Sequence, residues 1–171
     1  SYNHGVEGET YDIHVLNDRE YTAKALLASL LMANGTPMLL AGDEFGNSQG
    51  GNNNGYCQDN SISWLDWPDK RHRLQTYVQE LIAVRNRIRL LNEDQWWNEQ
   101  RVQWLSSDGL AMGETCWHNR GIKAMQVLID GEWLLLVNAK RSQQLFNLPQ
   151  GQWEMSCVPS KKFNYSSAKC T

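Results

Sequence analysis

The length, composition and charge of the chain indicate a globular protein with an uncharged ligand. The sequence has 171 residues, of which 41% are hydrophobic and 20% charged, and its formal net charge is -3. These values exclude a disordered or fibrous chain, and without a long single-sign charge run we expect no nucleic acid or membrane partner. The sequence has neither about 20 consecutive apolar residues nor a secretory signal pattern, so we expect a cytoplasmic protein.

The cysteines and tryptophans indicate which kinds of binding site the protein could have. The four cysteines are far apart, with no C-x-x-C pair and no zinc-finger spacing, so we predict free thiols, no metal site and no cofactor. The eight tryptophans are unusual, and several are close in sequence: Trp64 and Trp67, then Trp96, Trp97 and Trp104. An indole face can stack on a sugar ring, but each tryptophan also buries a large apolar area, so core packing is the alternative.

The first predicted element is a helix over residues 17–34. Asn17 and Glu20 are spaced like a capping box, strong helix formers follow, and Gly35 provides a stop. The apolar run 36–41 comes directly afterwards, with Pro37 near its start. This pattern predicts a strand that is buried on both faces, as in parallel sheets.

A second helix is predicted from residue 74 to residue 91. Apolar residues recur there at helical spacing, and the arginines fall mostly on other faces, so we expect them to be solvated or snorkelling. The apolar positions are Leu74, Tyr77, Val78, Leu81, Ile82, Ile88 and Leu91, and the arginines are Arg71, Arg73, Arg85, Arg87 and Arg89.

Beyond residue 98 the sequence consists of short apolar runs separated by residues typical of turns. The runs are 101–105, 124–130, 132–139, 143–149 and 152–158, and Asp130-Gly131 is a good hairpin turn. We therefore predict an incomplete antiparallel β domain over 98–171. A lone parallel strand has no partner for its hydrogen bonds, so residues 1–97 read as the last part of a larger α/β barrel or sheet.

The stretch "GTPMLLAGDEFGNSQGGNNNGYCQDNSISWLDW" closely resembles the region around the eighth barrel strand of isoamylase-type bacterial glycogen debranching enzymes, members of the α-amylase family. The opening "YNHGVEG" resembles the loop after the seventh strand. The resemblance spans roughly residues 2–100 and weakens to pattern level in "RVQWL" and "GQWE". It implies a (β/α)8 barrel followed by an antiparallel β-sandwich.

The resemblance also implies hydrolysis of α-1,6-glucosidic branch linkages in glycogen or limit dextrin. Retaining glycoside hydrolases place two carboxyl groups about 5 Å apart across the scissile bond. None of the family's three catalytic carboxylates maps onto this sequence, which has no His-Asp pair. We therefore expect no catalytic residue here, an inactive isolated chain, and the upstream remainder of the parent protein and an α-glucan as partners.

Candidate substrate-binding residues gather in the stretch 43–56. In an extended segment Asp43 and Glu44 point to opposite faces, so they cannot flank one bond as acid and nucleophile. By resemblance, one would hydrogen-bond to active-site groups and the other would anchor the loop through an ion pair.

The loop that follows is rich in glycine and asparagine. Its glycines permit unusual backbone angles, its amides offer donors and acceptors for sugar hydroxyls, and Tyr56 offers a stacking face. The alternative is a loop whose amides satisfy one another over a barrel end. Residues 64–67, "WLDW", are expected to pin the loop to the last helix. The amides in the candidate set are Asn52, Asn53 and Asn54.

The last twelve residues, "SKKFNYSSAKCT", lack apolar alternation. Either the β domain is cut short or this end is foreign to the fold. The leading interpretation is the C-terminal part of a debranching hydrolase. The rival is a non-catalytic glycan-binding or scaffold module.

Overall fold

The computed structural model describes residues 2–67 and 72–157, which form two compact units. Of the described residues, 2–67, 72–87 and 155–157 belong to the first unit and 88–154 to the second. The predicted domain division after residue 97 stays a prediction. No helix in the described ranges has the length and apolar character to cross a bilayer.

Helix α1 (Ile13–Leu31) begins four residues before the predicted cap at Asn17. Asp12 is the actual cap, because its side chain accepts a hydrogen bond from the amide of His14 at 2.8 Å and satisfies a first-turn donor. Glu20 instead pairs with Lys24 at 2.6 Å along the helix. The capping-box interpretation was therefore wrong in position, although the helix itself is confirmed.

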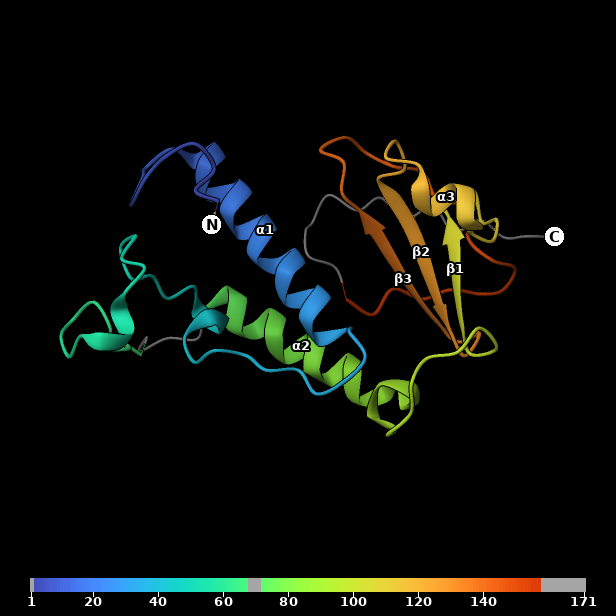
Figure 1. The fold of residues 1–171 in the computed structure, drawn as a ribbon, viewed down its shortest axis with the longest axis horizontal. Coiled ribbons are helices and arrows are strands. Elements are labelled where there is room, and N and C mark those ends of the chain that lie inside the picture. The colour runs from blue at the N-terminus through green and yellow to red at the C-terminus, as the bar shows by residue number, and fades with distance from the viewer. Residues whose placement is uncertain (1, 68–71, 158–171) are drawn as a thin grey trace. The chain divides into compact units, whose positions relative to one another are not determined.

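Helix α2 (Arg73–Arg87) packs beside α1 and supplies most of the first unit's core (Figure 1). Its apolar positions are buried as the helical spacing predicted, except that Ile82 is exposed. The helix ends at Arg87. Leu91, the last apolar position of the predicted helix, lies in a separate 3-10 turn, η3 (Arg89–Asn92). The buried apolar side chains of the two helices are Leu27, Leu31, Leu74, Tyr77, Val78 and Leu81.

Arg85 does not lie on a solvated face, contrary to the sequence interpretation. Its side chain is buried, and the guanidinium donates to the carbonyls of Leu31 at 2.6 Å, Ala33 at 2.9 Å and Gly35 at 2.6 Å. These carbonyls lie at and just beyond the end of α1, where helical partners run out. Burial lowers the pKa of Arg85. The residue thus ties α2 to the C-terminus of α1.

The predicted buried strand over residues 36–41 is wrong for this structure. The segment is extended but joins no sheet, and Met38 and Leu40 are 86% and 69% exposed. A strand needs neighbours to take its amides and carbonyls, and the described part of the first unit contains no other strand. The described residues of the first unit therefore do not show the predicted part of a barrel.

The second unit is built on a three-stranded antiparallel sheet in the order β1-β2-β3 (Figure 1). The strands are β1 (Val102–Ser106), β2 (Ala124–Ile129) and β3 (Trp133–Asn138), and a short helix, α3 (Glu114–His118), lies between the first two in sequence. In the register, Val127 of β2 faces Trp104 of β1 and Leu135 of β3. Three of the predicted runs are thereby confirmed as strands.

The hairpin between β2 and β3 turns at the predicted dipeptide. Asp130 and Gly131 both have positive φ, at 51° and 71°, and the amide of Glu132 closes the turn on the carbonyl of Ile129 at 3.0 Å. Two consecutive positive φ values characterise the turns that suit right-twisted hairpins, and Asp and Gly tolerate them. This prediction is confirmed.

The remaining runs, 143–149 and 152–157, are not strands, so the described residues hold one open sheet and no sandwich. The first run is joined through Asn147 to Gln126 of β2 and to Ser107, the residue after β1. Asn147 donates from its amide to the Ser107 carbonyl and accepts the side-chain amide of Gln126, at 2.8 Å and 2.9 Å. Leu145 in the same run is 89% exposed.

Candidate functional site

Asp43 and Glu44 lie in a one-turn 3-10 helix, η1 (Asp43–Phe45), and not in the extended segment that the sequence suggested. The turn follows Gly42, and the carboxylate of Glu44 accepts the Gly42 amide at 2.9 Å. Asp43 is exposed. Successive side chains in such a helix diverge by about 120°, so the two carboxylates still cannot flank one bond. Within the described ranges neither forms an ion pair.

Gly42 makes the close approach of this turn possible. Its φ is +100°, and a Cβ there would lie 2.7 Å from Cβ of Asn47 and 2.9 Å from Cδ2 of Leu65. The carbonyl of Gly42 accepts two amides, from Phe45 at 3.1 Å and Asn47 at 2.9 Å. The conformation of the carboxylate pair therefore depends on a residue without a side chain.

In the glycine- and asparagine-rich loop, some polar side chains form hydrogen bonds within the loop and others are exposed to solvent. Asn52 accepts the amide of Asn54 at 2.8 Å, and the side-chain amide of Asn54 contacts Sγ of Cys57 at 3.1 Å, next to the short 3-10 turn η2 (Gly55–Cys57). Asn53 is exposed, and Tyr56 is 90% exposed. Of the predicted binding residues, Asn52 and Asn54 thus form hydrogen bonds within the loop. Asn53 and Tyr56 expose an amide and an aromatic ring to solvent.

The N-terminal segment 3–8 forms a second loop in the same unit, and it lies in the opening stretch whose sequence resembles the loop after the seventh barrel strand. Arg19 of α1 donates to the carbonyls of Gly8 at 2.8 Å and Asn3 at 3.0 Å, and also to that of Val6. Asn3 in turn donates to the carboxylate of Glu7 at 2.9 Å. No sequence signal pointed to Arg19 as the residue that holds this loop, in which Gly5 and Gly8 take positive φ.

The expected pinning of the glycine- and asparagine-rich loop to α2 by the tryptophans near it stays a prediction. Trp67 packs edge-on against Phe45 of η1 with ring centroids 5.1 Å apart, and Trp64 donates its indole N–H to Asp59 at 2.7 Å. Both indoles are more than half exposed. In the second unit, Trp104 of β1 meets Trp97 and Trp117 at centroid distances of 6.0 Å and 5.5 Å.

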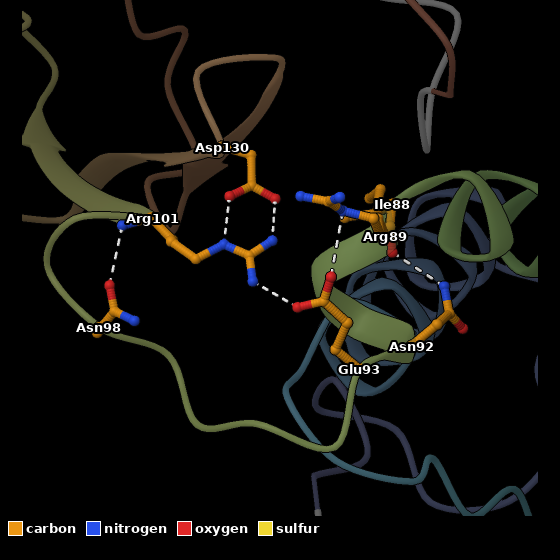
Figure 2. A network of polar contacts seen from close by, with 7 residues as sticks. All are labelled: Ile88, Arg89, Asn92, Glu93, Asn98, Arg101 and Asp130. Atoms are coloured by element: carbon orange, nitrogen blue, oxygen red, sulfur yellow. Dashed lines mark hydrogen bonds and ion pairs between the residues drawn. The ribbon is translucent and has the colours of Figure 1, made fainter.

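The polar network of the second unit is centred on Arg101 (Figure 2). Its guanidinium forms two hydrogen bonds of 2.7 Å to the carboxylate of Asp130 and a further one to Glu93. Arg89 adds an ion pair to Glu93 at 3.1 Å. The hydrogen bonds from Arg101 lower the pKa of both Asp130 and Glu93, and these carboxylates raise the pKa of Arg101. The network ties η3, the start of β1 and the hairpin turn together.

The remaining features of the described residues that bear on ligand binding are a cavity, the side chains that can ligate metals, and the cysteines. A cavity of about 170 Å³ at one end of the sheet is lined by Ser106, Ser107, Asp108, Lys123 and Lys140, none of them a predicted site residue. Across residues 2–67 and 72–157, no three His, Cys, Asp or Glu side chains come together as metal ligands. Three cysteines are free thiols, Cys57, Cys116 and Cys157, and Cys170 lies outside the described residues.

The sequence is similar to that of known proteins over most of its length. Residues 92–166 match the family described as "Glycogen debranching enzyme C-terminal domain". The sequence is 51% identical over 160 residues to the "Glycogen operon protein GlgX homolog" of Haemophilus influenzae. This match covers 90% of the present chain and 24% of that protein. The sequence is 44% identical over 156 residues, with the same coverage, to proteins named "Glycogen debranching enzyme" from Yersinia pseudotuberculosis and Yersinia pestis. The chain is thus similar in sequence to the C-terminal part of bacterial glycogen debranching enzymes.

The chain spans about a quarter of the length of the curated relatives it matches. The family match to residue 166 reaches into the final twelve residues, whose place in the fold the sequence left open. Because 90% of the chain is matched by each relative, the loop 46–60 lies within the matched part. The role of the candidate residues at 43–56 stays a prediction.

Proposed function

We propose that this chain is the C-terminal part of a cytoplasmic enzyme that hydrolyses α-1,6-glucosidic branch linkages in glycogen or limit dextrin. The observation that carries the proposal is the 44% identity to proteins named glycogen debranching enzyme, over 90% of the chain. The catalytic carboxylates of the retaining mechanism are proposed to lie in polypeptide upstream of residue 1. The isolated chain is therefore inactive in hydrolysis.

In this proposal the first unit forms one side of the substrate site. Asp43 and Glu44 shape the rim, and the loop amides together with Tyr56 contact glucan hydroxyls and ring faces. The exposure of Asn53 and Tyr56 supports this assignment, since amide and aromatic groups together suit an uncharged polyhydroxyl ligand. Asn52 and Asn54 contribute by holding the loop's shape.

A chimaeric enzyme tests the proposal. The segment of the Yersinia pseudotuberculosis relative that matches this chain is replaced by residues 1–171, and release of linear maltooligosaccharides from limit dextrin is measured after purification. We expect the chimaera to debranch and the host truncated before the segment to be inactive. A chimaera that folds but releases nothing contradicts the proposal, as does hydrolysis by the isolated chain that survives repurification.

The rival function is a non-catalytic glycan-binding module, and the half-exposed indoles of Trp64, Trp67 and Trp117 favour it. Isothermal titration of the isolated chain with glycogen separates the two readings. Micromolar binding together with an inactive chimaera favours the module. Absence of binding together with an active chimaera favours the enzyme.

A further inference from the structure

We propose that Arg19 is a positioning residue for glucan binding, which fixes the loop 3–8 against the glycine- and asparagine-rich loop. This inference rests on the proposed debranching function. Arg19 extends from α1 and holds the carbonyls of Asn3, Val6 and Gly8 with one guanidinium. A planar group with five donors suits this task, and a lysine ammonium cannot reproduce its geometry.

Holding these carbonyls also places the carboxylate of Glu7. Asn3 accepts the amide of Gly5 at 2.9 Å through its side chain and donates to Glu7 at 2.9 Å. His4 has a φ of 58°, and Gly5 and Gly8 also take positive φ. Since such backbone conformations are individually unfavourable for non-glycine residues, the loop needs external contacts to keep this shape.

The two loops meet at Glu7 and Gly51. A Cβ on Gly51 would lie 3.0 Å from the Oε1 atom of Glu7, so this carboxylate lies directly beside the backbone of the second loop. Glu7 is exposed, as are Asn53 and Tyr56 of the second loop. A carboxylate acceptor thereby joins the amide and aromatic groups already assigned to the glucan, and Arg19 sets its place.

The contacts of Arg19 are with an exposed loop and not with the core between α1 and α2. Its loss is therefore expected to lower the fraction of molecules with the loop in place, while the helices remain. An apparent affinity scales with the competent fraction, so a drop of that fraction to about one tenth raises KM about tenfold. Groups that act on the bond itself are unchanged, so kcat stays within about twofold.

The first test uses the 171-residue chain and does not require activity. Protease Glu-C cleaves after Glu7 and Glu9, and mass spectrometry of the N-terminal peptides gives the cleavage rate. We expect Arg19→Gln to be cut at least about fivefold faster, with helical ellipticity retained, and Arg19→Lys to be intermediate. The matched control is Lys24→Gln on the same helix, which loses its ion pair to Glu20 and leaves the loop protected. Equal rates in all four proteins overturn the proposal.

The second test measures KM and kcat for limit dextrin in the active chimaera. Arg19→Gln is expected to raise KM about tenfold at nearly constant kcat, with partial recovery in Arg19→Lys. Lys24→Gln changes neither constant. An unchanged KM with a lower Tm assigns Arg19 a structural role only and overturns the proposal. An inactive chimaera speaks against the proposed function, and the proteolysis result then decides on Arg19 alone.

Discussion

Replacing Arg85 tests how α1 and α2 are held together. Arg85→Met keeps most of the apolar stem of the side chain and removes the guanidinium that donates to three carbonyls beyond the end of α1. Arg85→Lys keeps the charge but has a single compact donor group. The two variants separate the hydrogen bonds from the packing, and both leave the backbone unchanged.

The expected loss follows from where the three carbonyls lie. A hydrogen bond to a charged group contributes about 1.5–3 kcal/mol, and a buried carbonyl left without a donor costs about 1–3 kcal/mol. The bond to Leu31 is buried, whereas Ala33 and Gly35 are exposed residues whose carbonyls water can reach. We therefore expect Arg85→Met to lower the free energy of unfolding by about 3 kcal/mol, and Arg85→Lys by about half as much.

Urea unfolding followed by ellipticity at 222 nm measures this loss, since α1 and α2 contain most of the helical residues. The control is Arg73→Met, which removes an exposed arginine from the first turn of α2 and should change stability by less than about 0.5 kcal/mol. If Arg85→Met proves as stable as this control, the guanidinium does not join the helices and the reasoning fails.

Three further outcomes are expected. Arg101→Met removes the partner that depresses two carboxylate pKa values, so the stability that the wild type loses as pH falls below about 4 should be absent, giving a flatter acid limb in urea midpoints. Gly42→Ala should cost at least about 2 kcal/mol by adding a clash to backbone strain, whereas Gly35→Ala, with similar φ and open space, should cost about 1 kcal/mol; equal losses in thermal unfolding would disprove the clash. Burial raises the pKa of Cys157 to about 11, so at pH 8 it should react with a thiol reagent far more slowly than exposed Cys57 in single-cysteine variants, and similar rates would contradict its burial.

The parts of the fold that sequence predicted well are those with local causes. The spacing of Leu74, Tyr77, Val78 and Leu81 gives α2 its buried face, because helical periodicity is a property of neighbouring residues. Asp130-Gly131 identified its hairpin because few dipeptides accept two positive φ values. Both predictions needed no knowledge of distant segments.

The misplaced parts depend on partners that local pattern does not contain. An apolar run at 36–41 indicates burial in a sheet, but without adjoining strands it stays unpaired and exposed. Arg85 was expected on a solvated face and Arg19 was not singled out, yet their carbonyl partners lie at least 50 and 11 positions away in sequence, respectively. At the candidate site, composition indicated the loop 46–60, whereas which amides face solvent depends on its folded path.

The bidentate contact between Arg101 and Asp130 joins residues 29 positions apart, and the amide of Asp130 also bonds to the carbonyl of Arg101 at 2.7 Å. Loss of Arg101 alone would leave the charge of Asp130 partly buried at a turn position that glycine or asparagine also suits, whereas loss of Asp130 alone would leave Arg101 with Glu93 as its carboxylate partner. Divergence at one position should therefore be accompanied by change at the other, so that the pair is inherited or lost together among relatives.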